Sequence, residues 1–473
     1  MERSNGTKKK NFSTFFRIVI EHPIITLITF AASKITITMR RLLICCVFFY
    51  AFNYIAAQDS TKTDYRFSLE DCITYAFANN FTRQSMKLSE RSKKEVYDLS
   101  KYLRYPNLSA SLSEGLNHKS SNTPAANWSG NYGLNSNVTL YQGGAITRTI
   151  EQNKLQADQS VIQTQQYDQG LMVQILQAFL TVLGNQELLK YQEAVVTTSA
   201  EQLKQGEAQW NAGSIMESDY LLLKAQDATA KSNVVNTKTT IVMNLITLKN
   251  LLSMDPVANL DIVYPSDQDM EALSLLPPQD VALQRCLETS PTLKLSQSSI
   301  DIANNGIQLA RSGYFPTVTL NGSIGTDHAP NYSNFATQIA NNFNQHIGLS
   351  VSIPIFDNYR TKSQVTQNKI ALMQAEIDKK EQQLSVSQTL VQEYQSVISY
   401  FSQYKANDIS QDAHYKTYQA YKAKFNAGAA TVVDLLQQQN NYLNALNSFI
   451  QTKYGFLLTR KILDIYMGEP IKL

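Results

Sequence analysis

The sequence has few of the residues on which catalytic and metal sites depend. His118, His328, His346 and His414 are scattered, and no two of them have the spacing of metal ligands. No phosphate-binding loop, nucleophile elbow or paired cysteine and histidine is present. We therefore expect a protein that is not an enzyme and that holds no metal and no cofactor.

Charge, cysteine and long apolar runs are also scarce. The formal net charge of +3 is too small to indicate binding to nucleic acid. Of the four cysteines, Cys45 and Cys46 fall in the N-terminal leader, and Cys72 and Cys286 resemble small core residues. After the leader, no apolar run approaches the ~20 residues that a membrane helix needs. Any membrane span must therefore be built from β-strands.

The N-terminus has the order of a secretory signal peptide. Arg40 and Arg41 follow Met39, and the apolar run 42–57 ends in small residues. We interpret residues 1–57 as an upstream extension and a signal peptide, with Met39 as the true start.

The alternative for this region is a membrane anchor over residues 24–57. Lys34 and the two arginines interrupt that segment, and each charge near the bilayer centre costs about 2.5–3.5 kcal/mol on insertion scales. Cys45 follows Leu43 and Ile44, a poor match to a lipoprotein cleavage box, so no N-terminal lipid is expected.

The chain repeats itself after about 210 residues. Three pairs of segments align: 105–112 with 315–322, 152–155 with 367–370, and 210–213 with 425–428. This period is much longer than that of a solenoid repeat. We predict a tandem duplication with a first repeat over 65–256, a linker over 257–279 and a second repeat over 280–470. Each repeat is expected to contain a helix, two strands, a very long helix, a turn and a helix.

Proline is missing from two long stretches. None occurs between Pro124 and Pro256 or between Pro354 and Pro470. Because an interior proline costs a helix about 3 kcal/mol or more, these stretches can hold uninterrupted helices. We predict long helices over about 144–209 and 359–424, each on the order of 100 Å at 1.5 Å per residue. Such a length suits a tube that crosses a compartment.

The predicted strands alternate between apolar and polar residues. Leu108, Ala110 and Leu112 share one face, while serines 109, 111 and 113 occupy the other. The other strands show the same pattern at Leu134, Val138 and Leu140; at Val318, Leu320 and Ile324; and at Leu349, Val351, Ile353 and Ile355. This alternation is typical of strands in membrane barrels, although a soluble sandwich also alternates.

Four strands are too few to close a barrel around a channel. Closure needs about eight strands, and open strand edges are not tolerated in lipid, so the chain must oligomerise. Three copies with four strands each would give about twelve strands, enough for an open lumen. The segments between the paired strands, 116–130 and 326–345, are rich in Asn, Ser and Pro and are expected to be surface loops.

Each long helix is expected to end at an Asn-Ala-Gly sequence. These sequences are Asn211, Ala212 and Gly213 in the first repeat and Asn426, Ala427 and Gly428 in the second. Glycine adopts the left-handed conformation that commonly ends a helix.

An aspartate lies six residues beyond each of these glycines. Asp219 and Asp434 would each form a ring of three carboxylates in a trimer and would favour cations at a narrow tube end. Alternatively, each carboxylate complements the dipole of the helix that it begins. For Asp219 the two readings stand side by side, and for Asp434 the family resemblance described below favours the ring.

The duplication, the two Asn-Ala-Gly turns and the strand-to-helix passage at 351–357 resemble the TolC-like outer-membrane efflux family over about residues 65–470. The resemblance implies an α+β membrane protein: a homotrimer with a twelve-stranded β-barrel in the outer-membrane lipid, continued by a long α-helical barrel in the periplasm. It also implies a channel of a tripartite efflux or type I secretion system. The partners would be a periplasmic adaptor (membrane fusion) protein, which would face the two Asn-Ala-Gly tips, and an inner-membrane RND or ABC pump.

The same resemblance exposes a difference at the inner end of the tube. Asp434 matches the family's first acidic gate position, but the second falls on Gln437. The position of the basic gate residue is Ala430, and that of its aromatic companion is Phe425. We therefore expect a single-ring constriction without the basic latch.

Two other classes of protein share part of this pattern. A structural periplasmic coiled-coil spacer would also have long helices rich in Gln, but it would not need the four strands or the signal peptide. An adaptor protein would have one helical hairpin, not two copies with strands.

Overall fold

The computed structural model describes residues 64–118, 126–263, 273–329 and 334–469, so the predictions made for residues 1–57 lie outside it. The helices and strands described below belong to one compact unit that begins at Tyr65. Only Asp64, the first residue of β1, lies before it. Among the described residues, no helix combines the length and the apolar character needed to cross a membrane.

The same series of elements occurs twice along the chain. The first series is α2 (Leu69–Asn79), α3 (Phe81–Lys101), β2 (Asn107–His118), β3 (Ala126–Gln142), α4 (Ala145–Asn211) and α5 (Glu217–Leu252). The second is α7 (Gln279–Thr289), α8 (Pro291–Arg311), β5 (Thr317–His328), β6 (Asn344–Ser352), α10 (Arg360–Asn426) and α11 (Val432–Tyr466). The remaining elements are β1 (Asp64–Phe67), β4 (Asn259–Ile262), α9 (Phe335–Asn341) and short 3₁₀ turns at Tyr102–Arg104 and Ser312–Tyr314.

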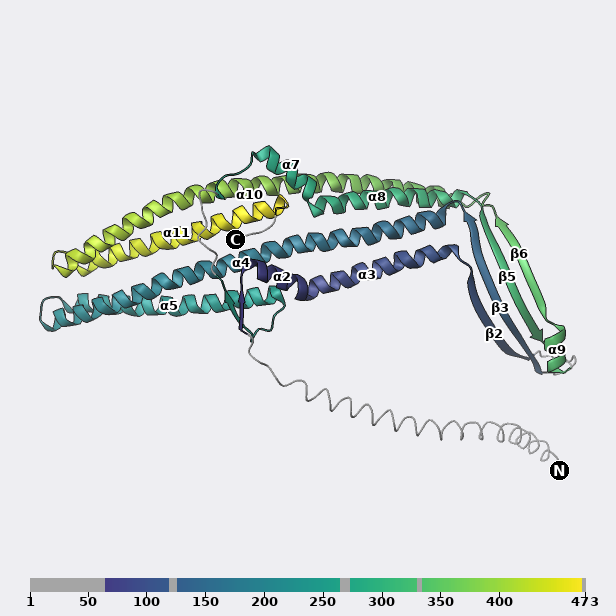
Figure 1. Ribbon diagram of the computed structural model, residues 1–473, viewed down its shortest axis with the longest axis horizontal. Coiled ribbons are helices and arrows are strands. Elements are labelled where there is room, and N and C mark those ends of the chain that lie inside the picture. The colour runs from purple at the N-terminus through teal and green to yellow at the C-terminus, as the bar shows by residue number, and fades with distance from the viewer. Residues whose placement is uncertain (1–63, 119–125, 264–272, 330–333, 470–473) are drawn as a thin grey trace, which may run out of the picture. The chain divides into compact units, whose positions relative to one another are not determined.

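The two long helices match the prediction closely. Both α4 and α10 have 67 residues, and their bounds differ from the expected ones by at most two residues. Each folds back at its end, α4 onto α5 and α10 onto α11, and we call these pairs the first and second hairpin. The four-stranded sheet lies at one end of the long helices, and the hairpin turns lie at the other (Figure 1).

The sheet is antiparallel, with strand order β2-β3-β5-β6, so that β2 and β6 have free edges. The predicted alternation is present. The register places Leu108, Leu112, Ile347 and Leu349 on one face of the sheet, where they are between 62% and 79% exposed.

Several local predictions need correction. β6 ends at Ser352, so Ile353 and Ile355 are not part of the strand. Pro354, which lies between them, has no N–H to donate to a strand ladder. Two helices, not one, precede each strand pair, because the backbone turns at Asn80 and at Ser290.

The predicted linker and loops also contain regular structure. β4 lies within 257–279 and pairs with β1. α9 lies within 326–345, and β2 and β3 both extend into 116–130.

The main core lies where α2, α4, α5 and α11 meet. It contains the α4 residues Leu171, Ile175, Phe179, Val182 and Leu183, as their three-and-four spacing predicts, together with Leu248 of α5 and Leu457 of α11. Cys72 and Cys286 are buried, as expected of small core residues. Burial raises the pKa of the Cys72 thiol to about 12, so the thiol stays protonated at neutral pH.

Candidate functional site at the hairpin turns

Each hairpin turns through a glycine in the left-handed region. Gly213 has a φ of +71° and Gly428 a φ of +72°. The N–H of Gly213 donates to the carbonyl of Trp210 (2.8 Å), and the N–H of Ser214 donates to that of Gln209 (2.8 Å). The equivalent bonds follow Gly428, so both helices end in the same pair of hydrogen bonds, the Schellman motif.

The six predicted tip residues all lie at these turns. Asn211 and Asn426 are the last residues of α4 and α10. They and the alanine and glycine that follow each of them, residues 212–213 and 427–428, are exposed. The structure therefore presents both Asn-Ala-Gly sequences to the surface of the chain.

Asp434 closes the N-terminus of α11. Its carboxylate accepts from the Thr431 hydroxyl (2.7 Å) and the Thr431 N–H (3.2 Å), while its own N–H donates to that hydroxyl (3.1 Å). This reciprocal arrangement is a capping box. The Thr431 hydrogen bonds hold the pKa of the Asp434 carboxyl below its ordinary value.

Asp219 occupies the same position of the first turn of α5 without that partner. The residue that caps α5 is Met216, whose side chain makes no capping hydrogen bond. Asp434 is exposed, whereas Asp219 is partly buried. Both aspartates lie in the first turn of their helices, as the dipole reading requires, and the ring reading stays a prediction for both.

A buried apolar cluster joins the two hairpins close to their turns. Leu223 of α5 lies in one cluster with Tyr418 and Phe425 of α10 and with Val432 and Leu435 of α11. Leu203 of α4 packs against it, and so do Ala430, Leu436 and Tyr442 of the second hairpin. We call Leu203, Leu223, Tyr418, Phe425, Val432 and Leu435 the tip cluster. Ala430 and Phe425, at the positions of the basic gate residue and its aromatic companion, thus belong to an apolar contact.

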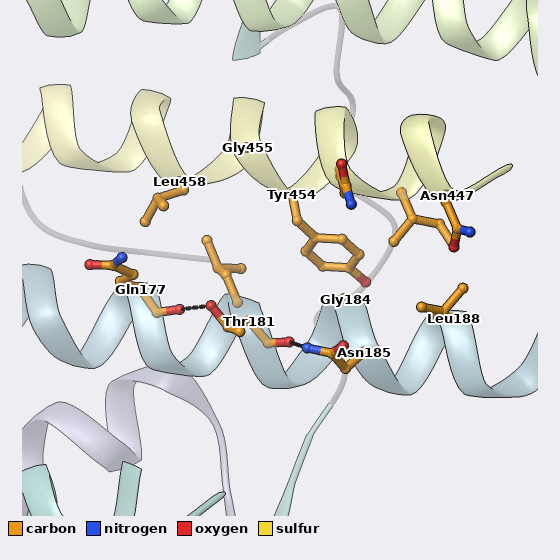
Figure 2. A pocket seen from close by; sticks show the side chains of 12 residues that line it. Gln177, Thr181, Gly184, Asn185, Leu188, Asn447, Tyr454, Gly455 and Leu458 are labelled. Carbon is orange, nitrogen blue, oxygen red and sulfur yellow. Dashed lines mark hydrogen bonds between the residues drawn. The ribbon is translucent and has the colours of Figure 1, made fainter. Parts of the chain in front are cut away.

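Further from the turns, a groove of about 310 Å³ separates α4 from α11. Tyr454 of α11 lies across Gly184 of α4 (Figure 2), where a Cβ atom would stand 3.2 Å from the ring. Thr181 and Asn185 donate back to carbonyls of their own helix, at 2.7 Å each. The Thr181 hydroxyl and the Asn185 amide nitrogen therefore bond within α4 and not across the groove to α11.

An ionic contact between the hairpins lies beside this groove. Glu187 of α4 accepts from the Lys453 ammonium (2.8 and 2.9 Å) and from the Tyr454 hydroxyl (2.7 Å) of α11. All three residues are partly buried, which weakens solvent screening of the ion pair.

Sequence reasoning missed a second group of polar residues, on the sheet. His328 is 5% exposed, and its Nε2 lies 3.2 Å from both carboxylate oxygens of Glu114. Tyr132 donates to the same carboxylate. Gly130 lies between Glu114 and His328 in register. The available signal was Glu114 itself, the acidic residue in the otherwise apolar series of alternate positions from Leu108 to Leu116.

Among the residues that the structure describes, no group of three or more His, Cys, Asp or Glu side chains is placed to hold a metal ion.

The comparisons with known proteins agree with this geometry. The model of the outer membrane efflux protein family matches residues 73–253 and 282–469. The chain belongs to the outer membrane efflux protein family.

Relatives and solved structures support the same assignment. The chain is 25% identical over 353 residues to outer membrane protein TolC of Vibrio cholerae serotype O1, which covers 69% of this chain and 74% of that protein. It is 21% identical to the alkaline protease secretion protein AprF of Pseudomonas aeruginosa, over 63% of this chain and 62% of AprF. Its fold matches the crystal structure of CusC with a TM-score of 0.74 and 17% identity, over 85% of this chain and 92% of CusC.

The protein is therefore an outer-membrane channel of an efflux or secretion system, in a family of channel proteins. Its long helices form a tunnel in the periplasm.

Proposed function

We propose that three copies of this chain form a passive exit duct. An inner-membrane pump, of RND or ABC type, would expel substrates through a periplasmic adaptor into the helical tunnel and out through the sheet. The observation that carries this proposal is the junction of an exposed apolar sheet face with two 67-residue helices that end in paired, exposed turns. The duct would carry out no chemistry on its cargo.

The free edges of the sheet support the trimer. β2 and β6 each have one unpaired edge, and an unpaired edge within lipid leaves backbone groups unsatisfied. Pairing β6 of one copy with β2 of the next satisfies both edges. Three copies then supply about twelve strands to a closed wall in the outer-membrane lipid.

The duplication supplies a second argument, because the contact between β3 and β5 within one chain is a template for the contact between β6 and a neighbour's β2. In the template, α4 follows β3 and packs against α8, which precedes β5. The Gln159 amide of α4 donates to the Ser299 hydroxyl of α8 (3.0 Å). In the alignment of the repeats these residues correspond to Gln374 of α10 and Ser89 of α3.

The exposed surface of α10 fits this arrangement. Its apolar residues recur every seven positions at Ile370, Ile377, Leu384, Val391 and Ile398. Four of these five, all but Val391, are between 44% and 60% exposed in the single chain. A stripe with a seven-residue period is typical of helices that pack along one another. A neighbour's α3 would cover it, as α8 packs along α4 within the chain.

We further propose roles for the turn residues. Asp219 and Asp434 would form carboxylate rings at the inner end of the tunnel, where a wall of low dielectric strengthens their field. The exposed Asn211, Ala212 and Gly213, with Asn426, Ala427 and Gly428, would face the adaptor. The two series of elements would descend from one duplicated unit, with repeats over 65–256 and 280–470.

Co-purification tests the proposed function. The protein, solubilised gently from its own cells, should migrate as a trimer and should bring with it an adaptor and an inner-membrane pump, which mass spectrometry would name. Substituting Gly213 and Gly428 together with Arg should remove the adaptor and leave the trimer. A monomer, or a trimer without an adaptor under chemical crosslinking, would contradict the proposal.

A further inference from the structure

Four short segments join the strands of the large sheet to helices. They are residues 102–106, 143–144, 312–316 and 353–359, at the end of the long helices opposite the hairpin turns (Figure 1). Neighbouring segments contact each other. The Arg104 guanidinium lies 3.4 Å from the Thr147 hydroxyl at the start of α4, and a Cβ atom on Gly313 would stand 3.0 Å from the Thr361 hydroxyl of α10. The four segments therefore lie side by side.

The two segments that lead from a strand into a 67-residue helix have the same backbone but different side chains. Gly143 and Gly144 have φ angles of +57° and +81°, and their counterparts in the second repeat, Asn358 and Tyr359, have +55° and +61°. Residues other than glycine rarely adopt this left-handed backbone, and a bulky aromatic residue is strained there. Tyr359 is thus present in spite of backbone strain, as is typical of residues at functional sites.

Glycine lets the first of these segments pack closely against the segment before β5. A Cβ atom on Gly143 would stand 2.6 Å from both Phe315 Cβ and the Ser312 carbonyl oxygen, too close for atoms that are not bonded. In the proposed trimer the same contact recurs between copies, where Asn358 replaces Gly143 and a neighbour's Tyr105 replaces Phe315. Because Asn358 has a Cβ atom, the copies cannot approach as closely as the two repeats do within one chain. A cleft therefore remains where two copies meet.

The cleft between copies is also more basic than the contact within the chain. Three exposed cations border it: Arg104, Arg360 and Lys362. The residues at the corresponding positions of the contact within the chain are neutral: Tyr314, Ala145 and Thr147. The two kinds of contact therefore differ in charge as well as in width.

These three cations have little acidic compensation. Asp357 offsets part of their charge, but its carboxylate already accepts from the N–H and the hydroxyl of Thr361 (2.9 and 2.5 Å). In the described part of the chain, no ion pair with a carboxylate includes Arg104, Arg360 or Lys362. The cleft thus presents positive charge to a ligand.

Apolar and aromatic side chains border the same cleft. Ile355 is 96% exposed and Phe356 is 72% exposed. The rings of Phe356 and Tyr359 meet edge to face with centroids 5.8 Å apart, and Lys362 Nζ lies 5.5 Å from the centroid of the Tyr359 ring. Aromatic rings and long basic side chains at the end of apolar strands are typical of a membrane interface.

We propose that each cleft between copies binds an anionic phospholipid of the periplasmic leaflet. The phosphate contacts the three cations, since basic pockets at a membrane surface attract anionic lipid and arginine binds phosphate through paired N–H groups. The acyl chains lie along Ile355 and Phe356. The lipid fills the space that Asn358 and Tyr359 keep open and becomes part of the contact between copies. This inference rests on the proposed function, because the cleft exists only in the trimer.

Native mass spectrometry of the delipidated trimer tests the lipid site. The trimer should bind one phosphatidylglycerol at each cleft, and phosphatidylcholine with the same acyl chains should bind about tenfold more weakly. Arg360→Gln combined with Lys362→Gln should lower the affinity for phosphatidylglycerol about 25-fold, a factor of about five for each cation. The matched control is Arg148→Gln combined with Arg311→Gln, which removes two cations from the contact within the chain and should leave the affinity unchanged.

Asn358→Gly combined with Tyr359→Gly tests the cleft itself. This variant has the two glycines of the first segment, so the copies should approach as closely as the repeats do and the bound phosphatidylglycerol should be lost. The trimer should resist dissociation by detergent at least as well as the unmodified protein, because glycine relieves the backbone strain. Loss of lipid from an intact trimer cannot be caused by misfolding.

Four results would overturn the lipid site. They are equal affinities for the two lipids, an equal loss in the two charge variants, full binding by the double glycine variant, and displacement of the lipid by millimolar inorganic phosphate, which would make the cleft a phosphate site. A protein that purifies only as a monomer would contradict the proposed function as well. A trimer that fails these lipid tests would contradict the lipid site alone.

Discussion

In the first hairpin the chain passes from α4 to α5 through Gly213, and in the second it passes from α10 to α11 through Gly428. The φ angles are +71° and +72°, and the hydrogen bonds around the two glycines are equivalent. The next helices begin at residues with nearly the same backbone, Met216 (φ −75°, ψ 154°) and Thr431 (φ −81°, ψ 162°). The main chain of the turn is therefore the same in both repeats.

The side chains of the two turns differ. Trp210 and Tyr220 stack on each other in the first hairpin, with ring centroids 4.9 Å apart, and Trp210 is 38% exposed. The corresponding residues of the second hairpin, Phe425 and Leu435, are buried in the tip cluster. The first turn thus contributes an aromatic pair to the surface, and the second contributes apolar side chains to a contact between hairpins.

Two turns with the same backbone conformation therefore make different contacts, and their side chains determine which. Glycine and a six-residue spacing place an aspartate at the third position of each helix. Only the second turn has the threonine that makes this aspartate part of a capping box. Four experiments can break or sharpen the comparison.

The largest effect is expected at Gly206 of the first hairpin. A Cβ atom there would collide with Leu223 Cδ1 of the tip cluster. Gly206→Ala should therefore destabilise the protein by about 1–3 kcal/mol, the usual cost of overpacking, and should lower the thermal midpoint measured by circular dichroism. Gly170→Ala in the same helix is the control, since its Cβ meets nothing within 4 Å and alanine favours helix. A stabilised Gly206→Ala would show that Leu223 is not held against α4.

The turn glycines come next, and here the two hairpins should behave alike. A Cβ at Gly213 or Gly428 meets nothing within 4 Å, so alanine costs only the strain of the left-handed backbone, about 1–2 kcal/mol at each site. Hydrogen exchange of peptides that span each turn should accelerate equally. Asparagine, which tolerates this conformation, should restore most of the protection. Unequal costs would mean that the backbones differ in solution.

Much of the fold could be predicted because its signals are local and repeated. The absence of proline over more than a hundred residues predicted α4 and α10, and alternation predicted the strands. β1 and β4 have four residues each, too few for a periodic pattern to show. The break at Asn80 was missed although its signal is local: the Asn80 side chain caps α3 by accepting from the N–H of Arg83 (2.9 Å), and it also donates to the distant carbonyl of Leu251 (2.9 Å).

The candidate site was predicted only where one residue decides the geometry. Gly213 and Gly428 each predict a left-handed turn from the identity of a single residue. The tip cluster could not be predicted, because Leu223 and Leu435 are 212 positions apart and only the packing of the two hairpins brings them together. The family resemblance favoured a ring for Asp434, and within the chain its carboxylate accepts a hydrogen bond from Thr431, three residues away.

Substitutions at the N-caps of α5 and α11 should change the stability of the two helix starts in opposite directions. Thr431→Ala removes the capping hydroxyl and should cost about 1 kcal/mol, seen as faster amide exchange in the first turn of α11. Met216→Thr should create the same capping box with Asp219 and slow exchange in α5 by a similar amount. If Met216→Thr has no effect, the side chain of Asp219 is held elsewhere.

Of the two turns, acid should weaken only the second, which has the capping box of Thr431 and Asp434. Because the folded pKa of Asp434 is lowered, its stabilisation is present above the ordinary value of 3.8 and is lost as the pH falls below it.

The smallest effect is expected from charge at the turns. Asp434→Asn keeps an acceptor for Thr431 but removes the negative charge, and Asp219→Asn does the same where no cap exists. If three copies bring these carboxylates into rings, each substitution should lower the preference for cations, measured as the reversal potential across a KCl gradient. Thr431→Ala, which removes the cap and leaves the charge, controls for the loss of helix structure. A reversal potential that moves with Thr431→Ala but not with Asp434→Asn would assign Asp434 to the cap alone and leave the constriction to other residues.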